Sequence, residues 1–195
     1  MDKIKPRKEY PAQDIEIIEL GDSTSKFIEG FECAIPEIEN FLKEDALRQA
    51  KESVNKTYLW MSREHKKLIG YITPCADSIR LDGIKKEEME RKGIRYKSLP
   101  ALKICRMGVR KDLRHQGIGT KMVFFAIKKA LKTNEISACR FITVDSKNDE
   151  EIPEKDKPFR FYKRLDFEEL KTREKRKNIH MYRDLINLIK EEARI

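Results

Sequence analysis

The sequence predicts a mixed α/β (α+β) fold with one principal domain, and three observations support this. Short β-rich runs alternate with segments whose apolar residues recur at helical spacing. The 195 residues fit the roughly 100–200 residues of a single domain. A strand at 102–109 also leads through a glycine-containing loop into an amphipathic helix at 121–131. We expect a flexible leader at 1–13, the main domain at 14–183, and a C-terminal helix at 184–195 that packs on it or serves association.

The N-terminal half contains a strand, a helix and a hairpin. Apolar and acidic residues alternate over 14–20, which suits a half-buried strand. Pro36 stands where a helix can begin, and apolar residues then follow at helical spacing, so we expect a helix from about 36 to 52. Two β-rich runs at 58–61 and 68–74 are separated by the polar SREHKK, which predicts a hairpin.

Charged residues dominate 82–98, which we interpret as a surface excursion with one helical turn. The run at 139–144 is almost wholly apolar, so it is expected to be a central strand. A short helix at 158–165, strands at 167–170 and 178–182, and the terminal helix complete the prediction.

Composition limits the class of protein without deciding its partner. Formal net charge is +9, which fits nucleic acid, phosphorylated ligands or anionic membranes, but equally a solvated lysine-rich surface. The four cysteines form no CxxC pair and have no histidine at metal-ligand spacing, so neither a metal site nor disulfides are expected. No apolar run approaches the ~18 residues of a membrane span, and the charged N-terminus does not resemble a signal peptide. We expect a soluble cytoplasmic protein.

The loop before the 121–131 helix carries the pattern Arg114-x-x-Gly117-x-Gly119. A helix N-terminus offers unpaired N–H groups and partial positive charge, which suit a phosphate. Glycines let that backbone approach the phosphate oxygens, and Arg114 can add a charged hydrogen bond. No GK[ST] follows, so this is not a P-loop, and its late position is unlike a Rossmann fingerprint.

Three elements in this order resemble the GNAT (GCN5-related) N-acetyltransferases. RHQGIG at 114–119 matches the family pattern Q/R-x-x-G-x-G/A, RMGV precedes it as in the fourth strand, and RFYKRLDF resembles FYxxxGF. The resemblance implies a mostly antiparallel sheet, splayed between strands 4 and 5 and flanked by helices, which binds acetyl-CoA in the splay. It implies that the backbone of Met107, Gly108 and Val109 pairs with pantetheine, and that the pyrophosphate is held by Arg114, Gln116, Gly117, Ile118, Gly119 and Thr120.

The segments FECAIPEIENFL and LPALKICRMGV are similar to the GNAT branch of toxin–antitoxin toxins, a resemblance that covers about 27–183. It implies that the acceptor is the α-amine of aminoacyl-tRNA, that tRNA and an antitoxin-type protein are partners, and that a homodimer can form. Two alternatives stay open. One is acetylation of a protein N-terminus, a lysine or a small-molecule amine, and the other is a non-catalytic CoA-binding module.

The resemblance also assigns residues to the chemistry. Tyr162 corresponds to the family tyrosine that protonates the departing CoA thiolate, which we favour over a purely packing role. Arg106 precedes the pantetheine-binding residues and either positions substrate or pairs with a carboxylate. Asp166 replaces the glycine of FYxxxGF, which puts the turn after Tyr162 in question. No general base can be named from the sequence.

Basic residues follow the proposed catalytic tyrosine. We expect them to form part of a tRNA-binding face, although a lysine-rich run is also the ordinary composition of a solvated turn. The candidates are Lys163, Arg164, Lys175, Arg176 and Lys177.

Overall fold

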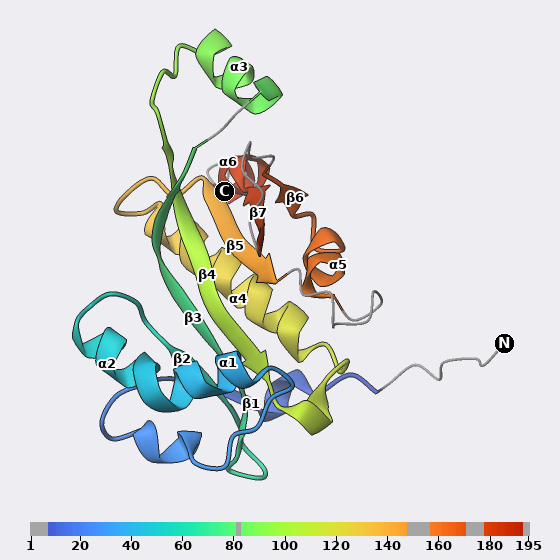
Figure 1. Ribbon diagram of the computed structural model, residues 1–195. Helices are drawn as coiled ribbons and strands as arrows, with labels where there is room; N and C mark the ends of the chain where they lie inside the picture. The colour runs from blue at the N-terminus through green and yellow to red at the C-terminus, as the bar shows by residue number, and fades with distance from the viewer. Residues whose placement is uncertain (1–7, 81–82, 148–156, 171–177, 193–195) are drawn as a thin grey trace, which may run out of the picture. The chain divides into compact units, whose positions relative to one another are not determined.

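The computed structural model describes residues 8–80, 83–147, 157–170 and 178–192, and within them it has seven strands and six α-helices (Figure 1). No helix in these ranges is long and apolar enough to cross a membrane. In chain order the elements are β1 (Ile15–Glu19), α1 (Pro36–Asn40), α2 (Ala46–Lys51), β2 (Tyr58–Ser62), β3 (Leu68–Ile79), α3 (Gly83–Arg91), β4 (Leu99–Val109), α4 (Ile118–Thr133), β5 (Phe141–Lys147), α5 (Pro158–Lys163), β6 (Glu168–Glu169), β7 (Asn178–Asp184) and α6 (Ile186–Glu192).

The strands form one sheet in the order β1-β2-β3-β4-β5-β7-β6. The pairs β1–β2, β2–β3, β5–β7 and β6–β7 are antiparallel, whereas β4 and β5 are parallel. The parallel ladder joins Ala101–Ile104 to Phe141–Val144, and β4 continues to Val109 beyond its last pair. The mostly antiparallel mixed sheet with flanking helices confirms the predicted fold class.

Two compact units share the chain. The first contains Met1–Cys75 and Cys105–Phe125, and the second contains Ala76–Ile104 and Ala126–Ile195. Three elements, β3, β4 and α4, therefore contribute residues to both units.

In the first unit, β2 is covered on both faces. Leu59 and Met61 join the cluster of buried residues that includes Phe41, Leu42 and Ala46 of the α1–α2 segment. The alternate side chains, Tyr58 and Trp60, make edge contacts with Phe125 of α4, with ring centroids 5.0 and 5.9 Å apart. Successive side chains of a strand point to opposite faces, so one strand can hold helices on both sides.

The helix expected over 36–52 is present, but it is not uniformly α-helical. A π-helical segment, Phe41–Asp45, lies between α1 and α2. Pro36 stands in the first turn of α1, as predicted from its lack of an amide hydrogen. The wider turn of the π segment accompanies the burial of Phe41 and Leu42, which are 8% and 0% exposed.

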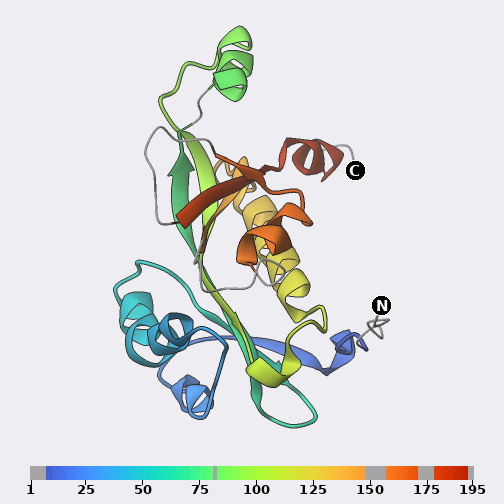
Figure 2. The ribbon, with the colours of Figure 1, turned by 45° about the vertical axis from the view of Figure 1, so that its right-hand side comes forward.

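In the second unit, a smaller core forms where β3 ends and β4 begins. Met89 of α3 is buried there with Ile79, Leu99, Phe141 and Tyr182. Figures 1 and 2 show α3 at the tip of the two strands that it connects. The excursion expected at 82–98 is thus more structured than predicted, because it contains a nine-residue helix rather than a single turn.

Candidate functional site

The glycine loop turns sharply into α4. Gly117 has a φ of +79° and His115 has a φ of +65°, so two left-handed residues in close succession reverse the chain before the helix begins at Ile118. A glycine adopts this conformation without steric cost. Among the described residues, no acceptor is recorded for the amides of Ile118, Gly119 and Thr120, as expected for the first turn of a helix. These donors, at the positive end of a 16-residue helix, suit a phosphate group.

Residues near the N-terminus lie against this loop. The amide of Tyr10 donates to the carbonyl of Gln116 over 2.9 Å. The carboxylate of Glu9 forms an ion pair with Lys121 in the first turn of α4. A Cβ placed on Gly117 would be 3.3 Å from Cγ of Glu9 and 3.6 Å from Nζ of Lys121. The loop therefore has both an anion and a cation at its mouth, and the cation supplies a further group for a bound phosphate.

Two glycines bring β3, β4 and α4 close together. A Cβ on Gly70 would lie 2.4 Å from the Met122 side chain and 2.7 Å from the Gly108 carbonyl oxygen, so only glycine fits in β3 at this point. A Cβ on Gly108 would lie 2.9 Å from the Tyr71 ring. This packing fixes the segment 107–109 of β4, which continues beyond the pairs with β5.

Arg106 lies among groups that hold its guanidinium in place. Its Cζ is 5.3 Å from the centre of the Phe41 ring, and its Nη2 is 3.7 Å from Glu37 Oε1. Its Nη1 donates to the Cys105 carbonyl over 2.8 Å. Of the two expectations for Arg106, pairing with a carboxylate is the one that the described contacts contain; a contact with substrate remains a prediction.

Tyr162 lies in the second unit, within an aromatic cluster. It is 6% exposed, and its ring lies 5.1 Å from Phe161 and 5.4 Å from Phe167, centre to centre. Burial raises the pKa of Tyr162 above its ordinary value, so the phenol is neutral at pH 7. A neutral phenol can donate a proton, which is the property that the predicted role requires.

The turn after Tyr162 has a left-handed residue at Asp166, where the family pattern has glycine. Asp166 adopts a φ of +60°, the left-handed conformation that glycine would take, and the amide of Phe167 donates to the Tyr162 carbonyl over 3.2 Å. Aspartate tolerates this region better than most residues. Lys163 and Arg164, beside Tyr162, are exposed.

The structure groups the predicted site residues by unit. Arg106, the 107–109 segment and the 114–120 loop all belong to the first, and Tyr162, Lys163 and Arg164 to the second. Lys175, Arg176 and Lys177 lie outside the described residues.

Several polar and small residues of these sites could not be identified from the sequence. The importance of Gly70 and of the Glu9–Lys121 pair depends on contacts between distant segments. A further cluster of this kind lies in the second unit, where Asp145 of β5 pairs with Lys103 of β4 over 2.6 Å and also with His180 of β7. Its only signal in the sequence is the presence of polar residues within otherwise β-rich runs.

Comparison with known proteins identifies the class of this site. A family model described as an acetyltransferase (GNAT) domain matches residues 55–169. No curated protein sequence matches the chain.

Solved structures of two proteins share the fold over nearly their whole length. A point mutant of KacT has a TM-score of 0.74 at 22% identity and covers 92% of this chain and 99% of its own. AtaT complexed with acetyl-methionyl-tRNAfMet has a TM-score of 0.74 at 20% identity, covering 93% and 100%. AtaTR bound with acetyl-CoA has a TM-score of 0.71 at 20% identity, covering 93% and 99%. At these identities the likeness shows the fold alone.

Proposed function

Because the chain belongs to the GNAT acetyltransferase family, and is therefore an N-acetyltransferase with acetyl-CoA as its donor, we propose that its acceptor is the α-amine of aminoacyl-tRNA. The observation that carries this proposal is the length of the structural match. The likeness to AtaT in its complex with acetyl-methionyl-tRNAfMet covers 100% of that chain, so it includes the parts outside the matched family domain. The formal charge of +9 supports the same substrate class, since a polyanion is attracted to a cationic protein.

The same comparison suggests protein partners and a location. AtaT has been solved bound to the C-terminus of the antitoxin AtaR. By analogy, this chain would be inhibited by an antitoxin-type protein, and its C-terminal helix is a candidate for that contact or for a homodimer. Translation uses charged tRNA in the cytoplasm, so a cytoplasmic location forms part of the proposal.

The first unit would bind the cofactor. The amides of Ile118, Gly119 and Thr120, with Arg114 and Lys121, would hold the pyrophosphate of acetyl-CoA, and the backbone of Met107–Val109 would pair with its pantetheine arm. The left-handed Gly117 and the helix start at Ile118 fit such a group. Acetyl-CoA supplies an activated thioester carbonyl to the reaction.

Tyr162 would complete the chemistry. The neutral acceptor amine attacks the thioester carbonyl, the C–S bond breaks, and the Tyr162 hydroxyl donates its proton to the departing sulfur. The nitrogen, now part of the amide, releases its extra proton to water, and the Tyr162 phenolate is reprotonated from solvent. A phenol that is neutral at pH 7 carries the proton that this step requires.

Charged total tRNA, incubated with acetyl-CoA and the protein, tests the acceptor. Mass spectrometry of the aminoacyl adenosine released by nuclease should show one added acetyl group, and deacylated tRNA should show none. If charged tRNA is unmodified while peptides or small amines are acetylated, the acceptor is a protein or small-molecule amine. Binding of acetyl-CoA with no turnover on any amine would instead indicate a non-catalytic module.

A further inference from the structure

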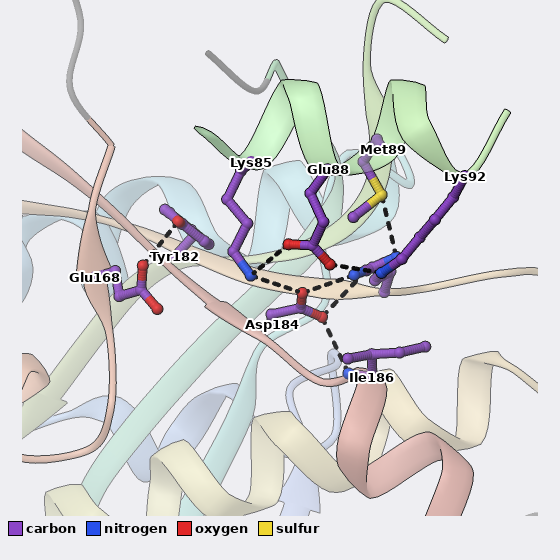
Figure 3. A network of polar contacts seen from close by, with 9 residues as sticks. Lys85, Glu88, Met89, Lys92, Glu168, Tyr182, Asp184 and Ile186 are labelled. Atoms are coloured by element: carbon purple, nitrogen blue, oxygen red, sulfur yellow. Dashed lines mark hydrogen bonds and ion pairs between the residues drawn. The ribbon is translucent and has the colours of Figure 1, made fainter. Parts of the chain in front are cut away.

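One side of α3 is fixed to the rest of the second unit by a network of ion pairs (Figure 3). Lys85 contacts Asp184 over 3.5 Å and Glu88 over 3.7 Å, and Glu88 also pairs with Lys92. Asp184 in turn receives hydrogen bonds from Nε and Nη2 of Arg140, at 3.1 and 2.8 Å. The Asp184 and Arg140 side chains are only 11% and 16% exposed, so this network is partly shielded from solvent. It anchors a helix that buries little apolar surface of its own.

The other side of the excursion holds a pocket rich in cations. We call it the α3 pocket; its exposed cationic and aromatic lining residues are Arg80, Lys86, Arg95, Tyr96 and Lys97. Tyr96 is 81% exposed, so its ring is open to a bound ligand. Among the described lining residues Glu90 is the one anion, and it lies 3.8 Å from Lys86.

The remaining cations of the α3 pocket are not neutralised by the described part of the chain. No ion pair or hydrogen bond to another described residue is recorded for Arg80, Arg95 or Lys97. Lys85 and Lys92 of the same segment differ from these three residues, because both are held in ion pairs. Paired charges hold the helix, whereas Arg80, Arg95 and Lys97, which have no partner among the described residues, are exposed around the pocket.

We propose that the α3 pocket is an RNA-binding surface, in which Arg80, Arg95 and Lys97 contact phosphodiesters and Tyr96 stacks on an unpaired base. This proposal rests on the proposed function, because it gives the tRNA substrate a surface outside the acetyl-CoA loop. Guanidinium and ammonium groups bind phosphate oxygens, and an exposed aromatic ring beside them provides a platform for a base. The pocket combines both chemistries within the short segment 95–97.

An acidic protein segment is the competing occupant, and the lining argues against it. The apolar lining residues Met89 and Leu99 are 3% and 8% exposed, and Ile94 is half-buried, so apart from Tyr96 the exposed side chains of the lining are charged or polar. Protein interfaces usually have an apolar centre. A surface of cations with one exposed ring matches a single-stranded nucleic acid better.

Neutralising Arg80, Arg95 and Lys97 together tests the surface. The variant Arg80→Gln/Arg95→Gln/Lys97→Gln should bind fluorescein-labelled deacylated tRNA at least tenfold more weakly at 100 mM salt. The slope of log affinity against log salt should flatten, by up to about 0.9 for each phosphate that the variant no longer neutralises. Acetyl-CoA affinity, measured by calorimetry, should stay at the wild-type value.

A matched control variant distinguishes the loss of local contacts with tRNA from the effect of a lower net charge. Lys128→Gln/Lys132→Gln/Lys190→Gln removes three exposed cations from α4 and α6 and lowers the net charge equally. It should bind tRNA nearly as wild type does. Equal weakening in both triple variants would mean that only overall charge matters, and this would overturn the proposal.

Tyr96 distinguishes RNA from an acidic protein. Tyr96→Ala should weaken binding of a single-stranded oligonucleotide by about five- to 100-fold, whereas Tyr96→Phe should retain it. Neither change should alter the binding of poly-glutamate, which carries charge without bases. An unchanged affinity of Tyr96→Ala for RNA, with poly-glutamate bound as tightly as RNA, would assign the pocket to an acidic protein and overturn the proposal.

These experiments distinguish two errors: a wrong assignment of RNA binding to the α3 pocket, and a wrong assignment of aminoacyl-tRNA as the acceptor. Acetylation of charged tRNA by wild type, together with wild-type tRNA binding by the triple variant, overturns the α3 pocket and leaves the acceptor in place. Salt-dependent tRNA binding that is abolished in the triple variant, without any acetylation of charged tRNA, supports the pocket and overturns the acceptor.

Discussion

The carboxylate of Glu9 forms an ion pair with the ammonium of Lys121, directly beside Gly117 in the loop that leads into α4. An anionic side chain thus lies at a helix N-terminus that suits a phosphate, where it competes for the same cation. A negative charge in the first turn of a helix interacts with the helix dipole by about 0.3–1 kcal/mol.

We therefore expect Glu9→Gln to bind acetyl-CoA more tightly. The amide keeps the size of the side chain, removes its charge and releases Lys121. The dissociation constant should fall by about two- to fivefold in calorimetry, the equivalent of the dipole interaction. Glu44→Gln, an exposed change in the π-helical segment, should leave it unaltered. Weaker binding by Glu9→Gln would show that Glu9 supports the loop rather than competing with the cofactor.

Gly117→Asp should abolish the rise in melting temperature that acetyl-CoA produces in wild type. A saturating ligand at 100 times its dissociation constant stabilises a protein by about 2.7 kcal/mol. The new carboxylate would face the pyrophosphate, and its Cβ would crowd Glu9. Gly30→Asp is the matched control, since Gly30 also has a positive φ, +73°, but has no neighbouring atom within 4 Å of its Cβ position. A normal thermal shift in Gly117→Asp would remove the phosphate-binding assignment.

Tyr162→Phe should lower the acetylation rate by roughly 10²–10⁴-fold while nearly preserving acetyl-CoA affinity, because it removes only the proposed proton donor. Tyr182→Phe provides the comparison. It deletes another largely buried hydroxyl of the same unit, one that donates to Glu168 over 2.9 Å, and it should retain the rate. Full activity of Tyr162→Phe at saturating substrate would make Tyr162 a packing residue.

Asp184→Asn should destabilise the fold by about 2–3 kcal/mol in urea unfolding, less than for a fully buried pair because both partners retain some exposure. The substitution leaves Arg140 and Lys85 without their shared anion. Asp45→Asn, which breaks the exposed pair with Arg48, should cost at most about 1 kcal/mol. Equal effects of the two substitutions would show that the α3 network contributes no more than a surface pair.

The same carboxylate predicts a pH dependence. Burial alone would raise the pKa of Asp184, but hydrogen bonds from Arg140 and the Ile186 amide, with the charges of Arg140 and Lys85, hold the pKa below its ordinary value. Its contribution to stability is therefore complete above the unfolded-state pKa, about 3.9, and is lost as the pH falls toward the folded-state value. Between pH 5 and pH 2 the free energy of unfolding should fall more in wild type than in Asp184→Asn. The difference should be of the order of magnitude expected for one paired carboxylate.

The sequence was informative wherever a local pattern determines the structure. The β-rich run at 58–61 predicted β2, and the glycines at 117 and 119 predicted a loop entering a helix. The sequence pattern did not predict the full length of α3. Among the described side chains of α3 only Met89 is buried, so the helix has no apolar periodicity. Ion pairs hold the helix instead, and one of them reaches Asp184, 99 positions from Lys85. The Glu9–Lys121 pair was equally hidden, since it joins residues 112 positions apart.

The way the chain alternates between its two compact units has a consequence for biosynthesis. The first unit is complete only when the ribosome has synthesised Phe125. At that point the Ala76–Ile104 part of the second unit has been made, but Ala126–Ile195 has not. A nascent chain therefore cannot finish one unit before it starts the other, unlike a protein whose domains emerge from the ribosome in turn. Any single break in the chain between residues 76 and 125 leaves both units incomplete, so a truncated product would expose unpaired strands rather than a functional half.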